Sequence, residues 1–346
     1  MRRLLMCCIL LVVITNPVNA AEFTAPEVPA QAEKYFPESR STFVSDFWQI
    51  FKNVIADIRP EIADAAGICL RVISIILIGT FIRENTGCVR KTINLVQVVG
   101  ISVILFESSR SMLLLGIETV TEILEYNKLF TPVMTGALAA QGGITTSTGL
   151  YVGTMVFNAV LGSVMKHFLV PMLYAYIAVC IAGCAIGENL LNDIKNFLKW
   201  LMSWTLKIII YIFTGYMSIT GVVSSSADAA AIKATKLTIS GVVPIVGNVI
   251  SDASDAVLGS AAVIKNSAGV YGLLAVSAIF LAPFLRVGVH YLLLKLTAAL
   301  CAMFDQNTGI ALVDNYGVVM GYVLAMIGLA CLLSLISTVC FMKGVQ

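Results

Sequence analysis

The chain has 346 residues, of which 58% are hydrophobic and only 12% are charged. A soluble domain carries about 25% charged residues, so a globule of this size could not cover itself with a polar surface. The composition therefore argues against a water-soluble enzyme and a disordered chain, and the net charge of +2 gives no support for nucleic-acid binding. It predicts an all-α, polytopic helical membrane protein.

The N-terminus has the features of a secretory leader. Two arginines precede an apolar run at 4–14, which is shorter than the roughly 20 residues that a bilayer span needs. Pro17 ends this run, and small residues follow up to Ala20. We expect a signal peptide with cleavage after Ala20, the alternative being an uncleaved signal anchor.

The rest of the chain divides into two parts. Residues 21–66 are expected to form a short extracytoplasmic linker and an amphipathic helix, and residues 67–346 a transmembrane domain. The helix is indicated by apolar residues at helical spacing over 43–58, with polar residues between them. We expect Pro60 to end it.

Apolar runs predict seven to nine membrane spans. The candidates are 68–82, 95–106, 149–165, 168–187, 201–223, 237–250, 270–285, 287–304 and 317–342. The run at 113–124 is interrupted by Glu118 and Glu122 and is assigned to the interface. The run at 237–250 contains Gly241, Pro244 and Gly247 and predicts a broken or re-entrant helix.

Basic residues between the runs suggest an orientation. Arg90 and Lys91 follow the first span, and Lys166 and Arg286 separate later pairs of spans. If these loops lie in the cytosol, the N-terminus is outside, the C-terminus is cytosolic and the number of spans is odd.

Glycines four residues apart can let two helices approach closely in a membrane. Three such pairs occur and are candidate packing contacts: Gly149 with Gly153, Gly183 with Gly187, and Gly317 with Gly321.

Catalytic and metal-binding motifs are missing from the sequence. It contains no GxxxxGK[ST] and no HExxH, and its cysteines lack metal-ligand spacing. We expect neither catalysis nor a bound metal or other cofactor.

Polar groups in apolar runs are the strongest functional candidates. Arg286 and His290 lie four residues apart in one run and could line a pore or contact a partner. Alternatively, Arg286 and Lys295 reach toward opposite interfaces of the membrane.

The most unusual stretch runs from 214 to 270, where small residues replace large apolar ones. Non-helical backbone is tolerated at membrane depth only inside protein or beside water, so this stretch could be a conduit or an inert helix junction. The candidate conduit and helix-break residues here are Asp228, Lys233, Gly241, Pro244, Gly247, Asp252 and Asp255.

This part of the chain resembles the stage III sporulation protein AE family. The resemblance is carried by SSSADAAA at 224–231, SGVVPIVG at 240–247, SDASD at 251–255 and APFLRVGVHY at 282–291. The leader and the multi-span body fit it too, whereas 21–60 matches only in type.

The resemblance implies a non-enzymatic membrane subunit of the complex between mother cell and forespore, in the mother-cell membrane. The implied partners are the other proteins of the stage III sporulation A operon, including a separate ATPase and ring-forming proteins, and stage II sporulation protein Q across the intermembrane space. Such a channel or secretion-like complex would sustain late forespore gene expression after engulfment. The alternatives are a small-solute permease and a structural scaffold.

Overall fold

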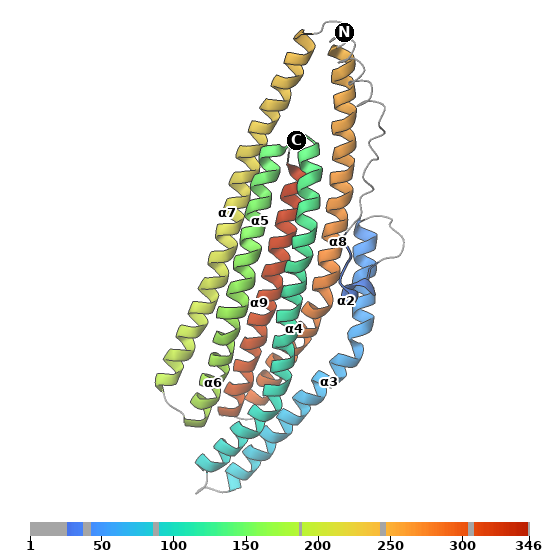
Figure 1. Ribbon diagram of the computed structural model, residues 1–346. Helices are drawn as coiled ribbons and strands as arrows, with labels where there is room; N and C mark the ends of the chain where they lie inside the picture. Colours follow the sequence, from blue (N-terminus) through green and yellow to red (C-terminus); the bar gives the residue numbers. More distant parts are fainter. Residues whose placement is uncertain are drawn as a thin grey trace.

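The computed structural model describes residues 26–36, 43–85, 90–186, 189–242, 247–303 and 308–344, so the expected signal peptide at 1–20 lies outside the described residues. In these parts of the chain all regular structure is helical (Figure 1). The elements are α2 (Ala30–Glu33), α3 (Phe43–Asn85), α4 (Arg90–Ala140), α5 (Ile144–Val164), the π-helical turn η1 (Met165–Leu169), α6 (Val170–Ile186), α7 (Asn189–Val242), α8 (Gly247–Ala302) and α9 (Thr308–Lys343).

Six of the described helical segments are long and apolar enough to cross a membrane, which confirms the all-α, polytopic fold class. These segments have 35 to 49 residues. At 1.5 Å per residue they are about 50–75 Å long, well beyond the roughly 30 Å of a hydrocarbon core. The bilayer can therefore cover only part of their length.

Two of the predicted pairs of spans are single helices in the structure. The runs at 149–165 and 168–187 join through η1, and those at 270–285 and 287–304 lie together in α8. The prediction that Lys166 and Arg286 lie in loops was therefore wrong. These charges interrupt an apolar run without ending a helix, because lysine and arginine are good helix formers. The orientation that rested on them stays a prediction.

Pro60 lies inside α3, so the prediction that it ends this helix was wrong. A proline removes one backbone hydrogen bond and bends a helix, and packing on both sides can hold the two halves together. Ile50, Val54 and Ile58 are buried before Pro60, and Ala65 and Cys69 after it. Figure 1 shows α3 bending along its length toward the α3–α4 end of the molecule.

The predicted span at 237–250 is not a separate helix. α7 continues to Val242 and α8 begins at Gly247, and both helices extend beyond the ends of α4, α5 and α9 (Figure 1). Ala, Ser and Thr dominate 224–240 in the last part of α7, which lacks a bulky apolar face and still continues the helix that the preceding residues have started. Pro244 lies outside the described residues.

α9 is the central helix of the bundle. It packs against α4, α5, α6, α7 and α8. Polar side chains bridge it to its neighbours: Asn127 on α4 hydrogen bonds Ser334, Thr154 on α5 hydrogen bonds Ser337 at 2.7 Å, and Tyr176 on α6 donates to Asn315 at 2.9 Å. Interhelical hydrogen bonds of this kind fix the register of helices whose packing surfaces are otherwise uniformly apolar.

Candidate functional site

An ion cluster joins α8 to α3 about midway along the bundle. Arg286 Nε lies 2.9 Å from Glu61 Oε1, and Arg286 Nη2 lies 3.4 Å from Asp57 Oδ2. Asp57 and Glu61 are four residues apart and so share one face of α3. Their side chains are 39% and 33% exposed and that of Arg286 is 27% exposed, so the cluster is open to its surroundings.

The turn that follows the short helix α2 adds two more groups to this cluster. Lys34 Nζ lies 2.8 Å from Asp57 Oδ2, and the Tyr35 hydroxyl donates to the same oxygen at 2.5 Å. The hydrogen bond to Asp57 raises the pKa of Lys34, so the ammonium form is favoured. Burial raises the pKa of Tyr35, so its hydroxyl keeps its proton. One carboxylate thus accepts contacts from three partners on two different elements.

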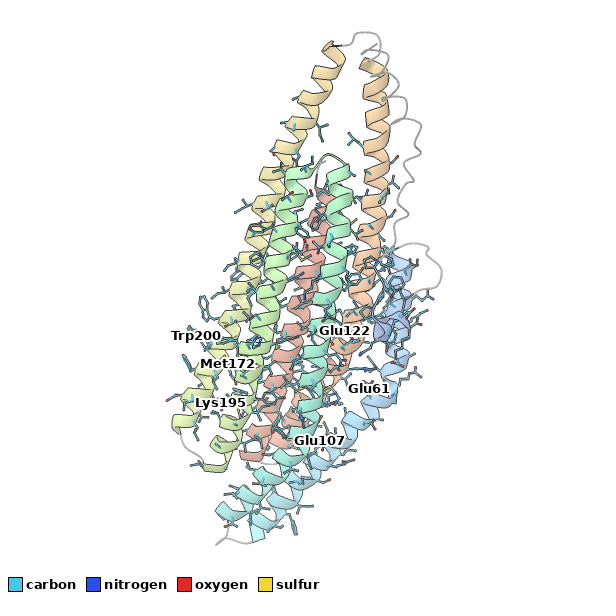
Figure 2. All side chains as sticks on the ribbon, viewed as in Figure 1. Glu61, Glu107, Glu122, Met172, Lys195 and Trp200 are labelled. Carbon is cyan, nitrogen blue, oxygen red and sulfur yellow. The ribbon has the colours of Figure 1, made fainter. Side chains whose placement is uncertain are left out.

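A cavity of about 220 Å³ lies beside the cluster, between α2, α4 and α8. Its polar lining comes from Gln31 on α2, Lys34 and Tyr35 in the turn after α2, Glu122 on α4 and Arg286 on α8. Figure 2 labels Glu61 on α3 and Glu122 on α4, at neighbouring heights of the bundle. Gln31 Nε2 also donates to Glu118 Oε1 at 3.1 Å. A space of this size with both signs of charge suits several water molecules or a small polar solute.

His290, the predicted neighbour of Arg286, does not join the cluster. Its Nδ1 lies 3.1 Å from the Arg286 carbonyl oxygen on its own helix. Its ring borders a narrow space together with Cys69, Ser109 and Leu294, among other residues. His290 therefore belongs to the packing between α3, α4 and α8. In the described residues no group of three or more His, Cys, Asp or Glu could hold a metal ion.

Asp228 occupies a different place, at the start of α5. Its carboxylate accepts hydrogen bonds from the backbone N–H groups of Thr145, at 3.1 Å, and Thr146, at 2.7 Å. Gly143, the residue that precedes α5, makes no side-chain cap of its own. Asp228 thus caps α5 from α7, a role that satisfies two otherwise unpaired donors and suits the positive end of the helix dipole.

The other candidates from 214–270 are not brought to Arg286. Lys233 is exposed on α7, beyond Asp228. Gly241 lies near the end of α7, and α8 begins at Gly247 and contains Asp252 and Asp255; their side chains lie outside the described part of the structure.

The glycine pairs differ in what they meet. A side chain at Gly153 would overlap the ring of Tyr216, whose hydroxyl donates to the Gly149 carbonyl at 3.0 Å. Gly317 and Gly321 face Lys295 and Tyr291 of α8. A Cβ at Gly183 would lie 3.5 Å from Leu191, and Gly187 lies outside the described residues. Isolated glycines make equally close contacts, such as Gly272 with Phe130 and Gly116 with Val323.

Sequence reasoning missed most of the ion cluster. The helical spacing over 43–58 places Asp57 only among the polar residues between the apolar ones, and the spacing in the later run relates Arg286 to His290. Asp57 and Arg286, which meet in the structure, are separated by 229 positions in the sequence. The available signal was the charge of Arg286 within an apolar run, since an arginine inside an apolar helix needs an acidic partner.

Comparison with known proteins gives one family. A model of the family described as stage III sporulation protein AE matches residues 31–344. The stage III sporulation protein AE of Bacillus subtilis (strain 168) is 20% identical over 206 residues, which are 60% of this chain and 52% of that protein. The chain thus matches about half the length of this curated relative. No solved structure matches the chain. The family match covers α2 through α9, including both the Arg286 cluster and the Asp228 cap, and the chain belongs to the stage III sporulation protein AE family.

Proposed function

We propose that this protein is a membrane subunit of a channel or secretion-like complex that supports the forespore after engulfment, and that the Arg286 cluster is its working site. The observation that carries the proposal is a partly exposed group of charges beside a polar cavity, in a bundle of long helices that are mostly apolar. Charged groups at such positions mark pathways for ions or polar substrates more often than structural contacts.

The proposed complex would supply the energy source that this chain lacks. The sequence has no nucleotide-binding loop, so energy would come from a separate ATPase of the stage III sporulation A operon. Ring-forming proteins of the same operon and stage II sporulation protein Q are the further proposed partners. The proposed location is the mother-cell membrane around the forespore, with the N-terminus outside and the C-terminus in the cytosol.

The test is complementation of a deletion strain in a spore-forming host. Arg286→Gln, Asp57→Asn and Glu61→Gln remove one charge each and keep the approximate shape of the side chain. We expect normal protein levels, arrest after engulfment and loss of a late forespore reporter. Arg59→Gln is the matched control, since Arg59 is an exposed charge on α3, the helix that carries Asp57 and Glu61. Wild-type sporulation in all three variants would refute the role of the cluster.

A separate measurement addresses the permease alternative. Purified protein in liposomes would move a small polar solute without partners if it were a self-sufficient transporter. We expect no such flux, because the proposed function needs the other subunits. Solute flux that disappears in Arg286→Gln would favour the permease.

A further inference from the structure

The cavity between α2, α4 and α8 contains an acidic group that has no basic partner. Glu122 of α4 lines this cavity, and among the described residues it has no ion pair and no hydrogen-bond partner. The charges that act on it come from Glu118 and Glu125 of its own helix and are negative as well. Glu118 differs from Glu122, because the Gln31 amide donates to its Oε1 atom. A positively charged ligand group in the cavity would offset this excess of negative charge.

A backbone acceptor lies in the wall of the same cavity. Pro283 lies inside α8 and has no N–H group, so it cannot donate to the carbonyl of Ile279 one turn earlier. Both residues line the cavity. An ammonium group carries three N–H donors, so it can bond the Glu122 carboxylate and the Ile279 carbonyl together. This pair of acceptors on two helices suits an ammonium group.

Arg286 has hydrogen-bonding capacity left for an anionic group. Its guanidinium carries five N–H donors. Nε lies 2.9 Å from Glu61 Oε1, but Nε is buried and has no aligned hydrogen-bond partner. The hydrogen bond from Nη2 to Asp57 is long, at 3.4 Å. No other described residue bonds this guanidinium, so most of the fork can bind a carboxylate, which it matches in shape.

The spacing of these groups limits the ligand that could contact them. Seven residues of α8, or about 10 Å of helix, separate Ile279 from Arg286. A hydrogen bond at each end takes up about 3 Å, so the two charged groups of the ligand would lie about 4 Å apart. Ala278 and Ala282 give the cavity an apolar wall. Its volume of about 220 Å³ is below the roughly 300–1,000 Å³ of pockets for drug-sized ligands, so the ligand is small.

We propose that this cavity binds a small zwitterion whose ammonium and carboxylate groups are joined by a short carbon chain, as in β-alanine. Glu122 and the Ile279 carbonyl hold the ammonium group, and Arg286 holds the carboxylate. This inference rests on the proposed function, in which the Arg286 cluster is the working site, and names the class of solute at that site. Such a ligand leaves the net charge of the site unchanged, and each of its charges meets a group of opposite sign.

Equilibrium dialysis of the purified full chain in detergent tests the proposal. The probe is radiolabelled β-alanine, and the competitors are propionate and ethylammonium at equal ionic strength. Each competitor keeps the carbon chain and one of the two charged groups of β-alanine. We expect saturable binding of β-alanine and at least about tenfold weaker competition by either analogue, because each leaves one of the polar partners in the cavity unpaired.

Two variants assign the two ends of the ligand. Glu122→Gln should weaken β-alanine binding at least about tenfold, after which propionate should compete as well as β-alanine itself. Arg286→Gln should weaken it similarly, after which ethylammonium should compete as well as β-alanine. A distorted cavity would instead weaken all three ligands alike. The matched control is Glu125→Gln, an exposed position on α4 outside the cavity lining, which should bind like the wild type.

Two results in the wild-type protein, which need no variant, would overturn the proposal. One is the absence of saturable β-alanine binding at millimolar concentrations, and the other is equally strong competition by propionate or ethylammonium. Binding is read independently of sporulation. Selective β-alanine binding combined with normal sporulation of Arg286→Gln would reject only the proposed function, whereas arrest of that strain without β-alanine binding would reject only this inference.

Discussion

The Arg286 cluster and the α5–α7 junction both place polar groups between helices, and the two places differ in how exposed these groups are. At the junction, the Asp228 carboxylate is buried and both of its oxygens accept backbone N–H groups. In the Arg286 cluster, Asp57, Glu61 and Arg286 stay partly exposed beside a cavity. The Asp228 contact therefore joins two helices, whereas the Arg286 cluster leaves charge partly exposed at the surface of the bundle.

The largest expected effect on stability is at the junction, from the contact between Gly153 and Tyr216. The Tyr216 ring cannot move aside easily, because it also packs on Phe157 and its hydroxyl is hydrogen bonded to Gly149. Gly153→Ala should therefore destabilise the protein by about 1–3 kcal/mol. The control is Gly215→Ala, where a Cβ meets nothing within 4 Å and should add up to about 1 kcal/mol of helix stability. Thermal unfolding in detergent measures both; an equal rise in Tm for the two variants would contradict this contact.

A smaller effect is expected from the Asp228 cap. Asp228→Ala leaves the N–H groups of Thr145 and Thr146 without their acceptor and should cost about 1 kcal/mol, at most about 2. Asp228→Asn keeps one carbonyl oxygen and should lose about half as much. Hydrogen exchange at the start of α5 should increase in the order wild type, Asn, Ala. If both variants exchange like the wild type, Asp228 is free to serve a conduit, and the contrast between the two regions fails.

The smallest effect on stability is expected in the Arg286 cluster. Partly exposed ion pairs contribute roughly 0–1 kcal/mol, so Arg286→Gln should shift Tm little even where it stops sporulation. Arg59→Gln, the exposed control on α3, should change neither Tm nor sporulation. A loss of stability in Arg286→Gln greater than that in Asp228→Ala would show that the cluster is a structural tie.

Hydropathy was enough to predict the fold class, because long uncharged runs have no other stable setting than a helical membrane bundle. It was not enough to predict helix lengths. Lys166 and Arg286 mark where an apolar run stops, yet the backbone hydrogen bonds continue through η1 and α8. Pro60 likewise does not end its helix, since residues packed on both sides of it keep α3 continuous.

The candidate site was partly predictable. Arg286 stood out as a charge in an apolar run, but its partners depend on how α3 lies along α8, which no local pattern encodes. Asp228 also stood out, and the structure gives it a capping role that requires the start of α5 to lie beside α7. The glycine spacing pointed to Gly153, whereas Gly272 meets Phe130 as a single residue and leaves no repeat to find.

The position of α9 has a consequence for biogenesis. This helix is the last of the described ones to leave the ribosome, yet it packs against α4, α5, α6, α7 and α8. The earlier helices can insert in turn, but the groove between them stays unfilled until α9 arrives. Insertion and tertiary closure are therefore separated in time, and a chain interrupted before residue 308 would reach the membrane as loosely associated hairpins, open to quality-control proteases.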